Sequence, residues 1–215
     1  MTTIKLSEKV RVSDPCYDND VWCKTNLTKV YPGEYNVEVD KTDLSDWGNR
    51  ISRLTVIHKG YVVECADESS WTPHSDIGVD SGQAGIFCES SYRNDELAKG
   101  ITTPPLDRPF VIPFRNEGDV WYDKMCNFTL SGESWGVYDT GVVTSSGIGD
   151  GSYPLDVVYN DNDEIVGIRV TYLDDTEDDY EDEDEGDCCG VCGAELESDD
   201  TCDYCEHFEN SKKED

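Results

Sequence analysis

The chain has 215 residues, a length that suits one ordinary domain with room for a small appendage. Its 48 acidic and 17 basic residues give a formal net charge of −31 at pH 7. Because nucleic-acid phosphates and anionic membrane surfaces attract basic faces, this balance argues against direct binding to either of them. The sequence contains no apolar run of membrane-spanning length and no signal-peptide pattern near residue 1, so we expect a cytoplasmic protein.

The acidic residues are concentrated near the C-terminus. Eleven of the fourteen residues from 174 to 187 are acidic, a composition typical of a disordered linker. From residue 174 onward, 20 acidic residues stand against two lysines, whereas the preceding part carries 28 acidic and 15 basic residues. The sequence therefore predicts a β-rich domain over residues 1–173, an acidic disordered linker over 174–187, a small module over 188–207 and a disordered tail over 208–215.

The hydrophobic pattern of the first 173 residues repeats mostly at every second position, which is typical of half-buried strands. An Asn/Asp-rich turn separates the last two strands and predicts the clearest hairpin. Another hairpin is expected where residues 61–63 pair back onto the strand that precedes them, and residues 65–75 and 89–109 are expected to be irregular. In chain order, strands are expected at residues 4–12, 34–40, 51–58, 79–87 (around a glycine loop), 110–114, 135–138, 141–144, 153–159 and 164–173.

Residues 118–130 (GDVWYDKMCNFTL) are the most convincing helix candidate, because Trp121, Met125 and Phe128 share one face at helical spacing. Helix is otherwise scarce, and turn signals recur about every 8–12 residues. The sequence thus predicts a mainly β fold, either a β-sandwich or a partly open barrel, with at most one or two short helices.

Residues 188–207 contain two Cys-x-x-Cys motifs, Cys189 with Cys192 and Cys202 with Cys205. Each motif presents two thiolates, and four thiolates bind Zn²⁺ tetrahedrally in a reducing compartment. The spacing predicts a structural zinc ribbon with one ion, whose folding depends on the metal because the module has little apolar content. Modules of this kind often serve in protein interaction, so we expect a protein partner, and the acidic charge favours a basic one.

Two glycine-rich loops, residues 78–85 (GVDSGQAG) and 145–154 (SSGIGDGSYP), each place an aspartate next to a strand, and Asp14 lies in a third turn. Two such carboxylates brought together by a β fold would suit a divalent cation or an acid/base pair. The alternative, which we favour, is that each aspartate caps its own turn through backbone amides. The candidate site residues are Asp14, Asp80 and Asp150 for catalysis, and Ser81, Gln83, Ser152 and Tyr153 for ligand binding.

Four ordered motifs, at residues 13–17 (SDPCY), 47–50 (WGNR), 78–86 (GVDSGQAGI) and 149–154 (GDGSYP), resemble a phage and bacterial family that is a domain of unknown function. The resemblance spans most of residues 10–172. It implies a phage or bacterial protein with a β-rich domain, and it assigns no activity and no catalytic residue. The acidic linker and the two Cys-x-x-Cys motifs lie outside it.

Three functions stay open at this point. The one we favour is a phage-encoded, cytoplasmic binding or accessory protein, since the sequence holds no recognisable catalytic constellation and no histidine motif that suits Cys16 as a base. The second is a metal-assisted hydrolase or small-ligand enzyme centred on Asp14, Asp80 and Asp150, which requires two of the carboxylates to lie close together. The third is an acidic mimic of nucleic acid that occupies a basic protein. The sequence leaves the oligomeric state open.

Overall fold

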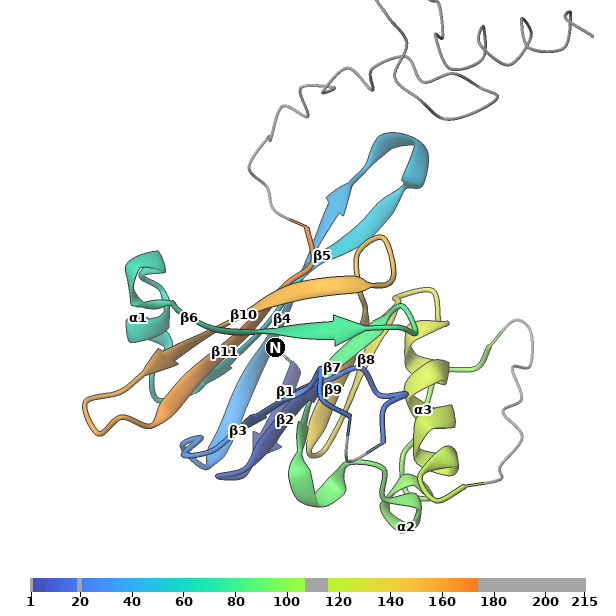
Figure 1. Cartoon of the computed structure of the whole chain (residues 1–215), viewed down its shortest axis with the longest axis horizontal. Coiled ribbons are helices and arrows are strands. Elements are labelled where there is room, and N and C mark those ends of the chain that lie inside the picture. The colour runs from blue at the N-terminus through green and yellow to red at the C-terminus, as the bar shows by residue number, and fades with distance from the viewer. Residues whose placement is uncertain (1, 19–20, 107–115, 174–215) are drawn as a thin grey trace, which may run out of the picture. The chain divides into compact units, whose positions relative to one another are not determined.

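The structure is a computed structural model that describes residues 2–18, 21–106 and 116–173. In these residues the strands form two antiparallel sheets, one of six strands and one of five (Figure 1). The mainly β fold expected from the sequence is confirmed. The expected strand at residues 110–114 and everything expected after residue 173, the cysteine motifs included, lie outside the described residues.

The six-stranded sheet has the order β1-β4-β5-β11-β10-β6, and every neighbouring pair in it is antiparallel. The hairpin predicted at the end of the domain is confirmed as β10 and β11, with Val157 opposite Ile168. The strands are β1 (Thr2–Leu6), β4 (Gly33–Asp43), β5 (Asn49–His58), β6 (Thr72–Val79), β10 (Gly151–Tyr159) and β11 (Ile165–Thr171).

The five-stranded sheet has the order β3-β2-β7-β9-β8. Its inner face shares one hydrophobic core with the six-stranded sheet, because Val12 and Ile86 cluster with Leu54 and Ile168. At the two seams between the sheets, the amide of Gly78 donates to the carbonyl of Cys23, and the amide of Lys5 donates to the carbonyl of Asp139 (both 2.8 Å). The strands are β2 (Val10–Ser13), β3 (Thr25–Leu27), β7 (Gln83–Cys88), β8 (Trp135–Tyr138) and β9 (Gly141–Ser145).

The predicted helix is confirmed as α3 (Asp119–Thr129), which lies with α2 (Asp95–Ala98) at one end of the two sheets (Figure 1). Its face of Trp121, Met125 and Phe128 packs with Phe87 and Val143 on the outer side of the five-stranded sheet. The Asp95 carboxylate accepts hydrogen bonds from the amides of Gly118 (2.9 Å) and Trp121 (3.0 Å), so α2 caps the start of α3. In the described part of the chain, however, there are three α-helices where we expected at most two.

The hairpin expected at residues 61–63 is wrong. That stretch begins a helical turn, α1 (Val62–Cys65), followed by the 3-10 turn η2 (Glu68–Ser70). The physical reason is that β5 is already paired on both sides, by β4 and by β11, and offers no free edge to a returning strand.

Other differences concern short elements. The single strand expected at residues 4–12 is two strands in different sheets, and the irregular stretch at 65–75 includes the start of β6. The expected loop at 89–109 contains the 3-10 turn η3 (Glu89–Ser91) as well as α2, and a 3-10 turn η1 (Ser45–Trp47) joins β4 to β5. None of the described helices is long and apolar enough to cross a membrane.

Candidate functional site

The strand order brings three loops to the same end of the two sheets. Strand β2 pairs with β7, which pairs with β9, so the loops that follow β2, precede β7 and follow β9 begin next to one another. Strand β6 in turn pairs with β10, with Val79 opposite Gly151. We call residues 14–18, 21–24, 80–82 and 146–150 the loop cluster, and it contains all three candidate aspartates.

Asp14 is fully buried, and its carboxylate accepts four hydrogen bonds. Its Oδ1 accepts from the amide of Cys16 (2.8 Å) and the hydroxyl of Ser81 (2.6 Å). Its Oδ2 accepts from the amides of Asp80 (2.9 Å) and Ser81 (2.7 Å). Since an ionised carboxylate has about four acceptor positions, this carboxylate is saturated by the protein itself. The bonds compensate the cost of burying its charge and fix the loop before β7.

Asp150, in the loop that follows β9, also binds the loop before β7, because its Oδ1 accepts the amide of Gly82 at 2.9 Å. Three successive amides, those of Asp80, Ser81 and Gly82, therefore all donate to carboxylates of other loops. Such a run of amides is a ready anion-binding site. Here its occupants are the side chains of Asp14 and Asp150.

Glycine is required where these loops touch. Gly82 and Gly149 have φ of +66° and +127°, which side-chain-bearing residues rarely adopt. A Cβ atom on Gly82 would lie 4.0 Å from the Cα atom of Gly149, so the two backbones lie directly against each other. The hydroxyls of Ser146 and Tyr153 both donate to the Gly149 carbonyl (2.7 Å each) and hold the second loop in shape.

The carboxylates of Asp14 and Asp150 both accept backbone amides, as capping aspartates do. The sequence alternative had each aspartate capping its own turn, whereas Asp150 caps the loop of Asp80, and Asp14 caps that loop as well as its own. Within residues 2–18, 21–106 and 116–173, no group of three or more His, Cys, Asp or Glu side chains is placed to hold a metal ion.

The four expected ligand-binding residues do not share one role. Gln83 is buried, and its Oε1 accepts the hydroxyl of Thr129 (2.8 Å), which anchors α3 to the sheet. Tyr153 is buried and holds the loop of Gly149. Ser81 is bound to Asp14, and Ser152 is exposed on β10 opposite Gly78. Three of the four thus serve the internal structure of the cluster.

The pKa values of three acidic side chains in and next to the loop cluster are raised, so their neutral forms are favoured. Burial, together with the charge of Asp14, raises the pKa of the Cys16 thiol to about 12. Burial and hydrogen bonding to Cys23 and Asp80 raise the pKa of Tyr17. On α3, burial and the neighbouring Cys126 raise the pKa of Tyr122. A thiol with so high a pKa is not a thiolate at neutral pH, so Cys16 lacks the property that a nucleophilic cysteine needs.

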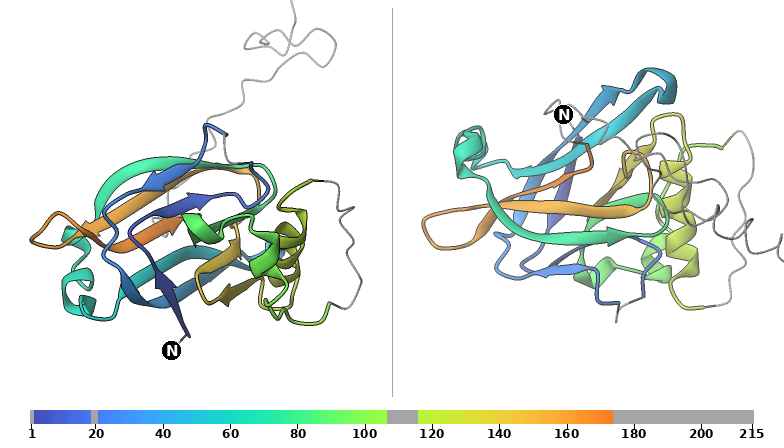
Figure 2. Two further views of the ribbon diagram at one scale, coloured as in Figure 1. Left: turned by 90° about the horizontal axis from the view of Figure 1, so that it is seen from below. Right: turned by 45° about the horizontal axis from the view of Figure 1, so that its top comes forward.

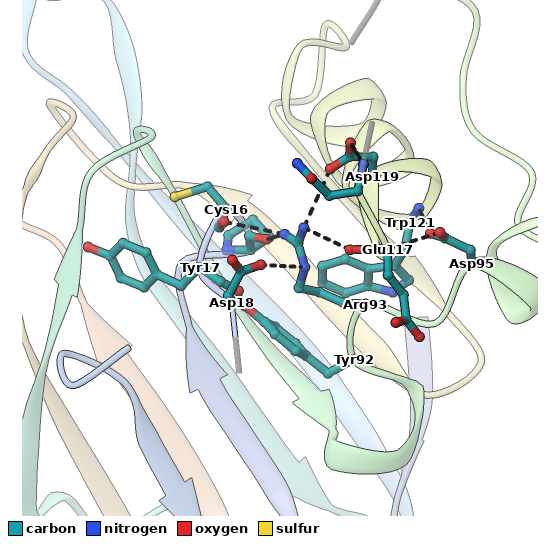
Figure 3. A network of polar contacts seen from close by, with 12 residues as sticks. Cys16, Tyr17, Asp18, Tyr92, Arg93, Asp95, Glu117, Asp119 and Trp121 are labelled. Atoms are coloured by element: carbon teal, nitrogen blue, oxygen red, sulfur yellow. Dashed lines mark hydrogen bonds and ion pairs between the residues drawn. The ribbon is translucent and has the colours of Figure 1, made fainter. Parts of the chain in front are cut away.

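Arg93 joins the loop cluster to the start of α3 (Figure 3). Its side chain is only 9% exposed, and it donates to the carbonyls of Pro15, Cys16 and Glu117 (3.3 Å each). It also forms ion pairs with Asp18 (3.4 Å) and Asp119 (3.5 Å). Sequence reasoning missed this residue because its segment was expected to be an irregular loop, and no motif marks it.

An open polar cleft of about 730 Å³ lies beside Arg93. Four carboxylate side chains line it, and Arg93 pairs with one of them, Asp18, and with Asp119. The lining residues are Asp18, Ser90, Tyr92, Arg93, Asn94, Asp95, Glu96, Asn116 and Glu117. The cleft therefore has acidic character.

Two large apolar side chains of the loop cluster are directed to solvent. Trp22 is 92% exposed and Ile148 is 64% exposed. Single exposed apolar residues are ordinary, but a tryptophan with almost its whole surface in water is unusual for a residue type that is highly buried on average. The cluster thus combines a fixed internal structure with apolar groups on its surface.

Comparison with known proteins returns no match to a family model, to a curated protein or to a solved structure. The resemblance to a phage and bacterial family therefore stays a prediction from the four sequence motifs.

Proposed function

We propose that this chain is a phage-encoded binding or accessory protein of the bacterial cytoplasm, and that its loop cluster contacts a protein partner. The observation that carries the proposal is the loop cluster, in which Asp14 and Asp150 both bind the loop of residues 80–82 and which exposes Trp22 and Ile148. In the same proposal, the C-terminal module binds one structural Zn²⁺ through Cys189, Cys192, Cys202 and Cys205.

A fixed surface favours binding, since loops that are already ordered lose little conformational entropy when a partner docks. Tryptophan is among the residues that contribute most to protein interfaces. A general acid/base role would instead need a carboxylate with a free oxygen and a proton to exchange. Both oxygens of Asp14 are engaged twice, so the contacts support a positioning role for it over a catalytic one.

The partner that fits best is a protein with a basic surface. Residues 1–173 carry 28 acidic against 15 basic residues, and the cleft beside Arg93 is lined by Asp18, Asp95, Glu96 and Glu117. Complementary charge accelerates association and makes it sensitive to salt. A nucleic-acid mimic would bind through charge alone, whereas the proposed surface also needs its apolar residues.

The test is partner capture with the immobilised full-length chain. The double variant W22A/I148S removes both apolar groups, and W47A is the matched control because Trp47 is 65% exposed on the turn between β4 and β5. We expect a protein from a bacterial lysate that the wild type and W47A retain equally and that the double variant retains at least about tenfold less, a change of roughly 1.4 kcal/mol. Equal retention by all three, disrupted by salt alone, would favour the nucleic-acid mimic.

The hydrolase alternative has its own test. The variant C189S/C202S removes thiolates from both Cys-x-x-Cys motifs, so any divalent ion that remains bound belongs to the rest of the chain. We expect none to remain. An ion that remained, and that was lost on adding D80N or D150N, would replace the binding proposal with the enzyme.

A further inference from the structure

Residues 61–71 run across the outer face of the six-stranded sheet, and we call them the strap. The strap contains α1 and η2 and appears beside β6 and β11 in Figures 1 and 2. Its buried residues Cys65 and Trp71 pack with Ile57, Val158 and Val166 of the sheet, in a cluster separate from the main core. The strap therefore covers an apolar patch that would otherwise be exposed.

The close fit depends on Gly167 of β11. A Cβ atom there would lie 3.0 Å from Sγ of Cys65, 3.1 Å from the ring of Trp71 and 3.2 Å from Cβ of Val158. These distances are shorter than most real contacts of a Cβ atom, so a side chain at this position would force its neighbours to shift by a few tenths of an ångström.

The end of the strap at Trp71 is held by several independent contacts. The indole Nε1 of Trp71 donates to the carbonyl of Cys65 (3.1 Å), and the guanidinium of Arg169 lies 4.3 Å from the centre of the Trp71 ring. Arg169 also pairs with Glu68 (2.6 Å) and with Asp156 (3.2 Å).

The other end is held by His58 and by the side-chain amide of Asn160, which donates to the hydroxyl of Tyr61 (3.3 Å). The ring Nδ1 of His58 accepts the amide of Gly60 (3.1 Å), and its carbonyl accepts the amide of Tyr61 (2.9 Å), the first residue of the strap. The rings of Tyr31, Tyr35 and Tyr61 surround the imidazole, with centroids 4.9, 5.2 and 5.5 Å away. The opposite edge of the imidazole, at Nε2, lies against the backbone of Gly33.

Protonation changes what this histidine can do. In the imidazolium both nitrogens are donors, so Nδ1 can no longer accept the amide of Gly60. Burial lowers the pKa of His58, which agrees with a site that disfavours the charged form. The charged neighbours Glu34 and Lys59 pair with each other at 2.9 Å, and Glu164, just before β11, accepts from Asn160. The hydroxyl of Tyr35 is engaged by the carbonyls of Tyr31 and Ile165.

We propose that the strap is a pH-sensitive cover, in which protonation of His58 releases the end at Gly60 and Tyr61 and exposes the apolar patch of Ile57, Val158 and Val166. Trp71 stays bound through Arg169, so the release begins at one end only. The inference is independent of the loop cluster, because no residue of the cluster contributes to these contacts.

The test is hydrogen exchange of the full-length chain, followed by mass spectrometry from pH 7.5 to 5 and corrected for intrinsic exchange rates. H58Q keeps an acceptor for the Gly60 amide but has no proton to gain, and H74Q is the control because His74 is exposed on β6. We expect protection of residues 61–71 to fall about tenfold in the wild type and H74Q, and to stay constant in H58Q.

Constant protection in the wild type, an equal fall in H58Q, or an equal fall in the peptide of α3 would each overturn the proposal. A second variant keeps the test decisive if H58Q does not fold. G167A crowds Cys65 and Trp71 by a few tenths of an ångström, so its strap should be less protected than that of the wild type at every pH while α3 keeps its protection. Strap protection in G167A that matches the wild type would also contradict the proposed cover.

Discussion

The carboxylate of Asp14 binds Ser81 twice, accepting its hydroxyl on one oxygen (2.6 Å) and its amide on the other (2.7 Å), although 67 positions separate the two residues in the chain. This pair connects the end of β2 to the start of β7 and forms the centre of the loop cluster. Removing its acceptor leaves buried amides without partners, which makes the pair directly testable.

We expect D14A to lower the free energy of unfolding by about 3–5 kcal/mol, since up to three backbone amides and a hydroxyl lose their acceptor. D14N is expected to cost roughly 2 kcal/mol or more, because its NH₂ group faces donors. Urea denaturation measures both, with D139N as the control on an exposed ion pair. A change in D14A no larger than that of D139N would mean that the four bonds are not formed in solution.

Gly136 on β8 gives a test of the packing between α3 and the sheet. A Cβ atom there would overlap the ring of Phe128, so G136A should destabilise the protein by about 1–3 kcal/mol through overpacking. G132A is a matched control, because a Cβ atom on Gly132 meets nothing within 4 Å. Thermal unfolding of the two variants, compared directly, checks the prediction; equal midpoints would contradict the position of α3.

Arg93 is expected to be irreplaceable by lysine. A lysine keeps the charge but cannot reach the carbonyls of Pro15, Cys16 and Glu117 together, so R93K should cost about 1.5–3 kcal/mol. Hydrogen exchange of R93K should also be faster than in the wild type at residues 14–18 and at the start of α3, and should change less elsewhere in the chain. K59M, at an exposed pair with Glu34, should change stability by less than about 1 kcal/mol.

The thiol of Cys16 should resist alkylation far above neutral pH. Its pKa of about 12 leaves roughly a thousandfold less thiolate than an ordinary thiol at pH 8. Because folding raises this pKa above the unfolded value of 9.0, the folded state binds the proton more tightly, and stability from this group is lost as pH rises above about 9. Mass-spectrometric alkylation of native and unfolded protein measures the difference, and equal rates would place Cys16 in solvent.

The zinc proposal makes a prediction about metal content. The full-length protein should contain about one Zn²⁺ per chain, and C189S should lose it because three thiolates bind the ion much more weakly. C188S is the control, since Cys188 lies next to the motif but outside its spacing. Elemental analysis after dialysis distinguishes the variants. Zinc retained by C189S and lost by C188S would assign the ligands differently.

The sequence was sufficient for those parts of the fold that depend on local periodicity. The spacing of Trp121, Met125 and Phe128 predicted α3, and the Asn/Asp-rich turn predicted the hairpin of β10 and β11. The assignment of residues 61–63 failed because it depended on whether β5 had a free edge, which β11 decides from more than a hundred residues away. Short turns of helix such as α1 and α2 depend on the same long-range packing.

The candidate site was only partly predictable, for a related reason. Glycines around Asp80 and Asp150 indicated loops in which backbones approach closely, and the loops do meet. The sequence does not show which loop each aspartate binds. A carboxylate that caps a distant loop has the same local sequence as one that caps its own turn. Arg93 carries no local signal at all, because its partners come from two other segments.

The hydrogen bonds of the loop cluster join positions near 14, 80 and 150, which is almost the full span of the described chain. During synthesis this surface cannot form until β10 has left the ribosome, because the amide of Gly82 donates to the carboxylate of Asp150, which directly precedes β10. No shorter fragment presents it. A partner that recognises the loop cluster would therefore distinguish chains that extend as far as β10 from shorter nascent chains or fragments.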